Sequence, residues 1–176
     1  SFAFRMKTDS ETKLTRNTGF HERTSKLTRN FVDARGFWLP NDYTKHGVIN
    51  EHTACREKAV IIDLSSLRKF EILGPDSEEL MNYTLTRNVK KLSVGQVVYS
   101  SMCYENGTMF DDGTLLKLSD HGFRWVCGDE YAGQWLKEQA AKKNYKVLIK
   151  NSTDQINNIS LQGPNSRKIL EKIIFT

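Results

Sequence analysis

Two adjacent aspartates, Asp111 and Asp112, are the residues of this 176-residue chain whose type and placement best suit acid–base chemistry. They lie within residues 108–118, a run with the composition of a β-strand. Side chains alternate between the two faces of a strand, so Asp112 shares the more apolar face with Phe110 and Leu116. A carboxylate among apolar neighbours needs a hydrogen-bond partner or a ligand. The pattern makes Asp112 a candidate catalytic residue, although two aspartates before a glycine are also typical of a turn or a solvated edge.

A β-hairpin is expected to position this pair. Residues 96–104 and 108–118 have strand composition, and Asn106-Gly107 between them supplies the positive φ angles of a tight turn. Gly113 introduces an alternative, because a glycine inside a strand often marks a bulge that shifts the alternation of side chains.

The remaining pattern predicts an α+β fold with antiparallel or mixed sheets and helices on one face. Residues 70–85 and 159–174 share a strand, a Gly-Pro-polar-Ser turn and an amphipathic helix, which indicates an internal duplication of interleaved ferredoxin-like units. The other expected elements are strands at 59–63, 69–73, 123–127, 145–149 and 156–162, and helices at 50–58, 78–85, 130–143 and 164–174.

Charge is concentrated at the start of the chain. The net charge is +5, and residues 1–50 hold nine Lys and Arg against five Asp and Glu. Neither helical nor strand periodicity persists there, so we expect an extended basic N-terminal arm over 1–50 that belongs to the domain formed by 51–176. Such an arm suits an anionic ligand, an acidic partner or a solvated surface. RNA binding is disfavoured because the aromatic residues do not cluster with Lys and Arg on one strand.

Other catalytic signatures are missing from the sequence. His52 has no partner at metal-ligand spacing, so no metal site is expected. The cysteines, Cys55, Cys103 and Cys127, are odd in number and form no Cys-x-x-Cys pair, which favours free thiols and a cytoplasmic location. No apolar run approaches the ~20 residues of a membrane span, so no membrane partner is expected.

An ordered set of short segments carries a family resemblance. The chain resembles the N-terminal half of the folate-binding domain of the aminomethyltransferase family, whose type member is the glycine cleavage system T protein. On this resemblance 51–176 is the N-terminal portion of a longer folate-binding domain. The segments are FHERT at 20–24, EHTACR at 51–56, VIIDLS at 60–65, GPDS at 74–77, LTRNV at 85–89, Tyr99, 106–112 and LQGPNS at 161–166.

The resemblance implies folate-dependent one-carbon transfer between an amine donor and tetrahydrofolate. It assigns the acid–base or orienting role to Asp112, places Leu67 against the pterin and Tyr99 in the pocket wall, and puts Cys127 where the family has an asparagine beside the cofactor. Because Gly113 and Cys127-Gly128 depart from the family pattern, the donor stays open.

The partners implied are a small amine donor or a lipoyl carrier protein, together with the remainder of the protein's own chain. In the family, a glutamate that grips the pterin and an arginine near the folate tail lie beyond the matched half, so these 176 residues are not expected to turn over alone. An uncovered apolar face on 164–174 is expected for the same reason. The alternative function is a non-catalytic folate-binding or folate-sensing module.

Overall fold

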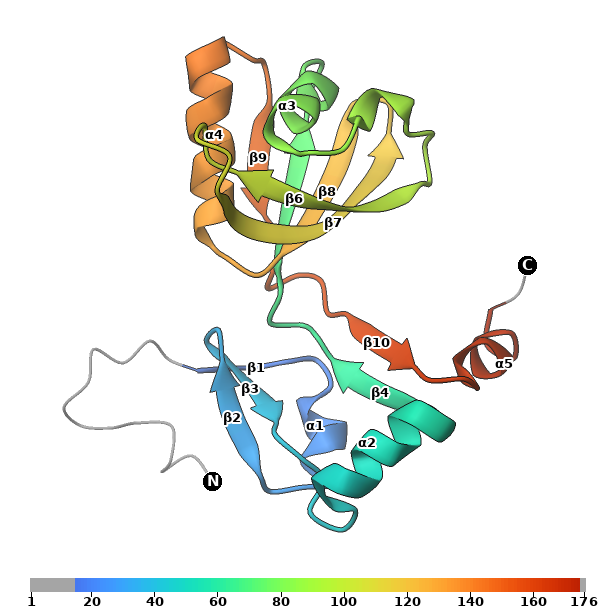
Figure 1. The fold of residues 1–176 in the computed structure, drawn as a ribbon. Helices are drawn as coiled ribbons and strands as arrows, with labels where there is room; N and C mark the ends of the chain where they lie inside the picture. Colours follow the sequence, from blue (N-terminus) through green and yellow to red (C-terminus); the bar gives the residue numbers. More distant parts are fainter. Residues whose placement is uncertain (1–14, 175–176) are drawn as a thin grey trace, which may run out of the picture. The chain divides into compact units, whose positions relative to one another are not determined.

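The chain, seen in a computed structural model that describes residues 15–174, forms two compact units (Figure 1). Unit 1 takes in the described residues up to Ser66 and those from Asn157 onward. Unit 2 is the continuous segment Leu67–Ile156. Unit 1 is therefore discontinuous in sequence, and its two segments are joined by the pairing of one strand from each, described below.

Unit 2 is built on a five-stranded sheet in which every neighbouring pair of strands is antiparallel, with order β6-β7-β8-β5-β9. Without β6, the order β9-β5-β8-β7 is that of a split βαβ arrangement. The predicted hairpin is confirmed as β6 and β7. The elements are β5 (Arg68–Leu73), α3 (Ser77–Thr84), β6 (Val97–Cys103), β7 (Met109–Ser119), β8 (Gly122–Cys127), α4 (Tyr131–Lys143) and β9 (Leu148–Asn151), with a short 3₁₀ turn at Val89–Lys91.

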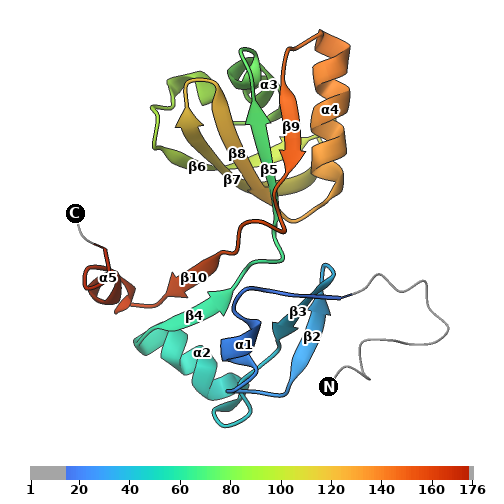
Figure 2. The same ribbon diagram turned by 180° about the vertical axis from the view of Figure 1, so that it is seen from behind.

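Both long helices of unit 2 pack on the same face of this sheet. The hydrophobic core joins apolar side chains of α3 and α4 to strand residues such as Leu115, Phe123 and Trp125, which are fully buried. Burying each side chain of this size contributes roughly 1.5–3 kcal/mol. In both views α4 runs beside β9 (Figures 1 and 2). The expected placement of helices on one face is confirmed for this unit, and the opposite face is called the open face below.

Unit 1 holds two small sheets. One has the order β1-β3-β2, and the other pairs β4 with β10 across nearly 100 residues of sequence. The elements are β1 (Arg16–Asn17), α1 (His21–Thr24), β2 (Phe31–Ala34), β3 (Phe37–Pro40), α2 (Gly47–Glu57), β4 (Val60–Asp63), β10 (Ile159–Gln162) and α5 (Ser166–Leu170).

The prediction of an extended arm over residues 1–50 is wrong for residues 15–50, while residues 1–14 lie outside the described residues. Arg35 and Gly36 both have positive φ, 55° and 79°, and turn the chain between β2 and β3. The Asp33 carboxylate accepts a hydrogen bond from the Gly36 amide at 2.9 Å. Phe37 is buried on β3. The boundary at residue 50 also falls inside α2.

The repeated strand, turn and helix motif is confirmed as local structure, once in each unit. Gly74 after β5 and Gly163 after β10 have φ of +129° and +120°. In each copy the carbonyl of this glycine accepts a hydrogen bond from the first helical residue, Ser77 at 3.1 Å or Ser166 at 3.0 Å. The helix predicted over 164–174 is shorter in the structure, where α5 ends at Leu170. Duplication of entire ferredoxin-like units stays a prediction.

The apolar face expected near the end of the chain is present. Four aliphatic residues in and after α5 are exposed: Ile169, Leu170, Ile173 and Ile174. Within residues 15–174, none of the helices has both the length and the apolar character needed to cross a bilayer.

Candidate functional site

Asp111 and Asp112 face opposite sides of β7, as the alternation predicts, but their environments are the reverse of the expectation. Asp111 is 8% exposed and lies on the face that packs against the helices, whereas Asp112 is only half-buried on the open face. The expectation that Asp112 occupies the more apolar environment is therefore wrong. Packing by α3 and α4, rather than the count of apolar residues along β7, decides which face is buried.

Asp111 has a structural role. Its carboxylate accepts hydrogen bonds from the backbone amides of Asp112 at 2.9 Å, Gly128 at 3.3 Å and Asp129 at 3.1 Å. These bonds hold the chain where β8 ends and α4 is about to begin. A buried carboxylate with this set of donors is satisfied as an anchor and needs no ligand.

The Asp112 side chain, by contrast, is available to a ligand, because its carboxylate makes no hydrogen bond or ion pair with residues 15–174. Asp112 pairs with Ser101 across the hairpin, and the next pair on the same face is Thr114 with Tyr99. Tyr99 is 57% exposed and lies diagonally across from Asp112, so the two side chains point to the same side of the sheet. The open face thus presents a carboxylate beside an aromatic ring.

Leu67 lies at the same end of the sheet. Gly113 of β7 pairs with Cys127 of β8, and Cys127 pairs with Arg68 of β5. Gly113, Cys127 and Arg68 therefore lie side by side across the three strands. Asp112 precedes Gly113 and Leu67 precedes Arg68, so Asp112 and Leu67 are also level with each other, two strands or about 10 Å apart. Leu67 is half-buried. The structure therefore gathers three of the predicted site residues, Leu67, Tyr99 and Asp112, at one end of the sheet.

Cys127 is not gathered with them. Its side chain is 2% exposed within the hydrophobic core, and its Sγ donates to the Asp129 carbonyl at 3.5 Å. Burial raises the pKa of the Cys127 thiol, and the negative charge of Asp111 raises it further. A contact between Cys127 and a cofactor stays a prediction, and in this structure the core covers the thiol.

The thiol environment predicts selective labelling. At pH 8 a thiol reagent should modify the half-buried Cys55 and Cys103 but reach Cys127 only after unfolding. Because the folded pKa of Cys127 is raised, its contribution to stability should decline by about 1.4 kcal/mol per pH unit above the unfolded value of about 8.5. Mass spectrometry of labelled peptides and unfolding curves at pH 8 and 10 check both statements. Cys127→Ala should remove this part of the pH dependence of stability. Rapid labelling of Cys127 in the folded protein would contradict the labelling prediction.

Gly113 does not form a bulge. It keeps its register with both Ser100 and Cys127, and the irregularity of the hairpin lies between Met102 and Cys103, where Phe110 is the extra residue. A Cβ at Gly113 would collide with the carbonyl oxygen of Val126. The glycine is needed because the sheet leaves no room for a side chain, so the alternation that separates Asp111 from Asp112 holds.

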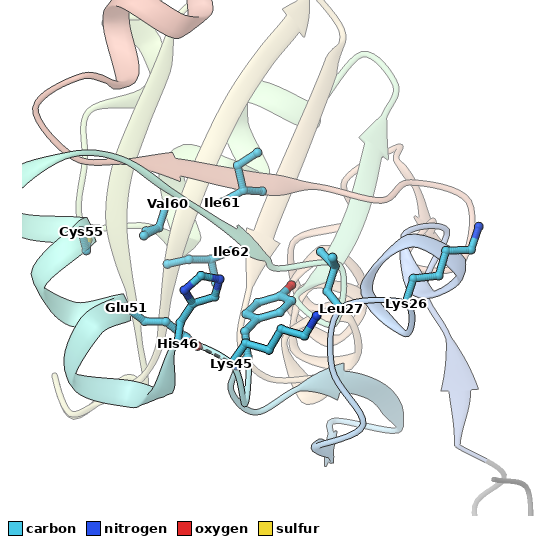
Figure 3. A pocket seen from close by; sticks show the side chains of 10 residues that line it. Lys26, Leu27, Lys45, His46, Glu51, Cys55, Val60, Ile61 and Ile62 are labelled. Atoms are coloured by element: carbon cyan, nitrogen blue, oxygen red, sulfur yellow. Dashed lines mark hydrogen bonds between the residues drawn. The ribbon is translucent and has the colours of Figure 1, made fainter.

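A separate cavity of about 550 Å³ lies in unit 1 (Figure 3). Apolar side chains of β4 line one part, and the lysines and His46 give it a basic edge. The Glu51 carboxylate accepts a hydrogen bond from the Tyr43 amide at 2.6 Å, and burial, then Glu51 and Asp63, raise the pKa of the Tyr43 phenol. The sequence pattern did not indicate this cavity, because its walls come from three segments of the chain. The lining residues are Lys26, Leu27, Tyr43, Lys45, His46, Glu51, Cys55, Val60, Ile61 and Ile62.

Comparison with known proteins shows the family to which the chain belongs. The family model described as the GCVT N-terminal domain matches residues 20–175. The chain belongs to this family. The aminomethyltransferase of Symbiobacterium thermophilum is 32% identical over 164 residues, which cover 90% of this chain and 43% of that protein. The trimethylamine-oxide aldolase of Ruegeria pomeroyi is 52% identical over 174 residues, 99% of this chain and 22% of that protein.

The fold is shared as well. The glycine cleavage system aminomethyltransferase T of Bartonella henselae superimposes with a TM-score of 0.75 at 25% identity, over 90% of this chain and 43% of that one. The GCVT-family chain therefore spans less than half of each of these three relatives. The family assignment and the mixed α+β fold made from the sequence are confirmed.

Proposed function

We propose that the protein containing this chain transfers a one-carbon unit between a methylated amine donor and tetrahydrofolate, with Asp112 as the carboxylate that serves the reaction. The observation that carries the proposal is that the Asp112 carboxylate on the open face has no partner among the described residues and lies close to Leu67 and Tyr99. The chain also belongs to the GCVT family. A carboxylate that has no partner among the described residues is available to a ligand, whereas Asp111 is not.

The residues present fit a reduced folate. Leu67 offers an apolar contact for a flat ring, Tyr99 an exposed aromatic wall, and Asp112 an acceptor for an N–H group or a positive charge. When bound, the folate supplies the nitrogen that accepts the one-carbon unit. Asp112 would hold or orient a proton at a reacting amine nitrogen and stabilise positive charge that develops there, a role that general acid–base groups fill with about 10²–10⁴-fold effect.

The choice of donor rests on the comparisons. Identity to the trimethylamine-oxide aldolase is 52% over nearly the whole chain, against 32% to the aminomethyltransferase of Symbiobacterium thermophilum. An aldolase that acts on trimethylamine oxide must release carbon as an aldehyde, and a one-carbon aldehyde is a suitable unit for tetrahydrofolate to accept. We therefore favour a small methylated amine or amine oxide over an aminomethyl group on a lipoyl carrier.

The test uses the full-length protein with tetrahydrofolate and either trimethylamine oxide or an aminomethylated lipoyl carrier. Formation of methylenetetrahydrofolate should depend on trimethylamine oxide and be much slower with the carrier. Turnover with the carrier alone would overturn the donor assignment but keep the one-carbon transfer. Folate binding without turnover of either donor would instead support a non-catalytic folate-binding module.

We also propose a cytoplasmic location, because the three free cysteines fit a reducing compartment.

A further inference from the structure

One lysine of unit 2, Lys69, is buried on the open face of the sheet. It pairs with Val126 of β8, and Val126 pairs with Thr114 of β7. Because paired residues point to the same side of a sheet, Lys69 lies on the same face as Asp112. Lys69 is only 1% exposed. A lysine normally packs its stem and keeps its ammonium in water, since burial of the charge costs free energy. An ammonium in this position therefore needs a specific partner.

One partner of the ammonium is the main chain of Leu67. The Lys69 Nζ donates a hydrogen bond to the Leu67 carbonyl oxygen at 2.8 Å. Leu67 lies just before β5 and outside its strand pairings, so these pairings do not set the direction of its side chain. The charge-assisted bond from Lys69 holds this carbonyl in place, and with it the conformation of Leu67.

The main chain of Lys69 is itself held firmly. Its amide donates to the Thr153 Oγ1 at 3.1 Å, and its carbonyl accepts from the Ser152 amide at 2.8 Å. Ser152 and Thr153 are both buried. The lysine side chain therefore starts from a fixed main chain and ends at the Leu67 carbonyl, which leaves it few rotamers to explore.

We propose that Lys69 is a positioning residue of the folate site: its buried ammonium sets the Leu67 side chain in advance for the flat ring of tetrahydrofolate. This role rests on the function proposed above, in which Leu67 supplies the apolar contact. A contact that is ordered before the ligand arrives costs less entropy on binding, so affinity rises. Asp112, which serves the chemical step, is two strands away from Leu67, so Lys69 affects folate affinity rather than the rate of catalysis.

Lys69→Met in the full-length protein tests this role, because methionine keeps most of the stem and removes the ammonium. Calorimetry should show tetrahydrofolate binding at least about 10-fold weaker, while kcat at saturating folate should change less than about 3-fold. Lys69→Gln is a second variant, to be used if methionine impairs folding. Its side chain is one bond shorter and also loses the bond to Leu67, so it should give the same result.

Lys150→Met is the matched control for the loss of a positive charge on this face. Lys150 of β9 pairs with Glu71 of β5, two residues after Lys69, so it lies on the same side of the sheet, and it is exposed. Its Nζ bonds to the Gln155 side chain at 3.0 Å and not to Leu67. Lys150→Met should leave the affinity for tetrahydrofolate unchanged.

A double-mutant cycle with Leu67→Ala separates positioning from a general loss of structure. Leu67→Ala alone should weaken tetrahydrofolate binding at least about 10-fold, and Lys69→Met should then add less than about 2-fold, because its effect passes through the Leu67 side chain. Losses that multiply in the double variant, an unchanged affinity in Lys69→Met, or an equal loss in Lys150→Met would overturn this role and leave the proposed function standing. A parent protein that binds no tetrahydrofolate would overturn both.

Discussion

Asp112→Asn in the full-length protein is expected to lower the rate of one-carbon transfer by about 10²–10⁴ and to leave tetrahydrofolate affinity nearly unchanged. Asparagine keeps the shape and the hydrogen-bonding capacity of the side chain but removes its negative charge and its basicity. Because no residue between 15 and 174 bonds to the Asp112 carboxylate, the substitution breaks no contact within this part of the chain, and stability should stay within about 0.5 kcal/mol. Steady-state kinetics, folate titration and thermal unfolding measure the three quantities.

Asp111→Asn gives the opposite pattern. Its carboxylate is buried and accepts amide hydrogen bonds from Gly128 and Asp129, so the neutral side chain should cost about 1–3 kcal/mol of stability. The rate of the protein that remains folded should change little. A large loss of rate in Asp111→Asn with stability intact, or equal rates in Asp112→Asn and the parent protein, would remove Asp112 from the mechanism.

These two aspartates also show how far the sequence could predict the site. The period of two along β7 separates Asp111 from Asp112 correctly, because alternation is a property of the strand itself. Burial is not such a property. Lys117 occupies a buried position on the Asp111 face because it pairs with Glu78 of α3 at 2.6 Å, so this face looked less apolar in sequence than it is in the fold.

Unit 1 was harder to predict for a different reason. Its strands β1, β2 and β3 have only two to four residues, too few for a periodicity to stand out. The turn between β2 and β3 gave only a weak signal. Turns with positive φ at both central residues usually contain Asn-Gly or Asp-Gly, whereas this one contains Arg35-Gly36. The pairing of β4 with β10 joins the two distant segments of the chain, and such long-range pairing leaves no local signature.

Gly74→Ala is expected to lower the free energy of unfolding by about 2–6 kcal/mol, because two effects add at this position. Gly74 has φ +129°, a conformation that costs an L-residue about 1–3 kcal/mol. A Cβ at this site would lie 2.5 Å from the carbonyl oxygen of Lys146, and relief of such overpacking typically costs a further 1–3 kcal/mol. Urea unfolding followed by tryptophan fluorescence measures the loss.

Gly95 and Gly163 supply the matched comparisons. Gly95 has φ +88°, and a Cβ there would meet no atom of residues 15–174 within 4 Å, so Gly95→Ala should cost only the backbone strain, about 1–2 kcal/mol. Gly163 repeats the geometry of Gly74, with φ +120° and a Cβ that would lie 2.6 Å from the Lys58 carbonyl oxygen, so its substitution should cost as much as that of Gly74. Equal losses at Gly74 and Gly95 would mean that the close backbone approach is not a constraint. A large loss at Gly74 with a small one at Gly163 would show that the two turns, alike in sequence, differ in how tightly each unit packs around them.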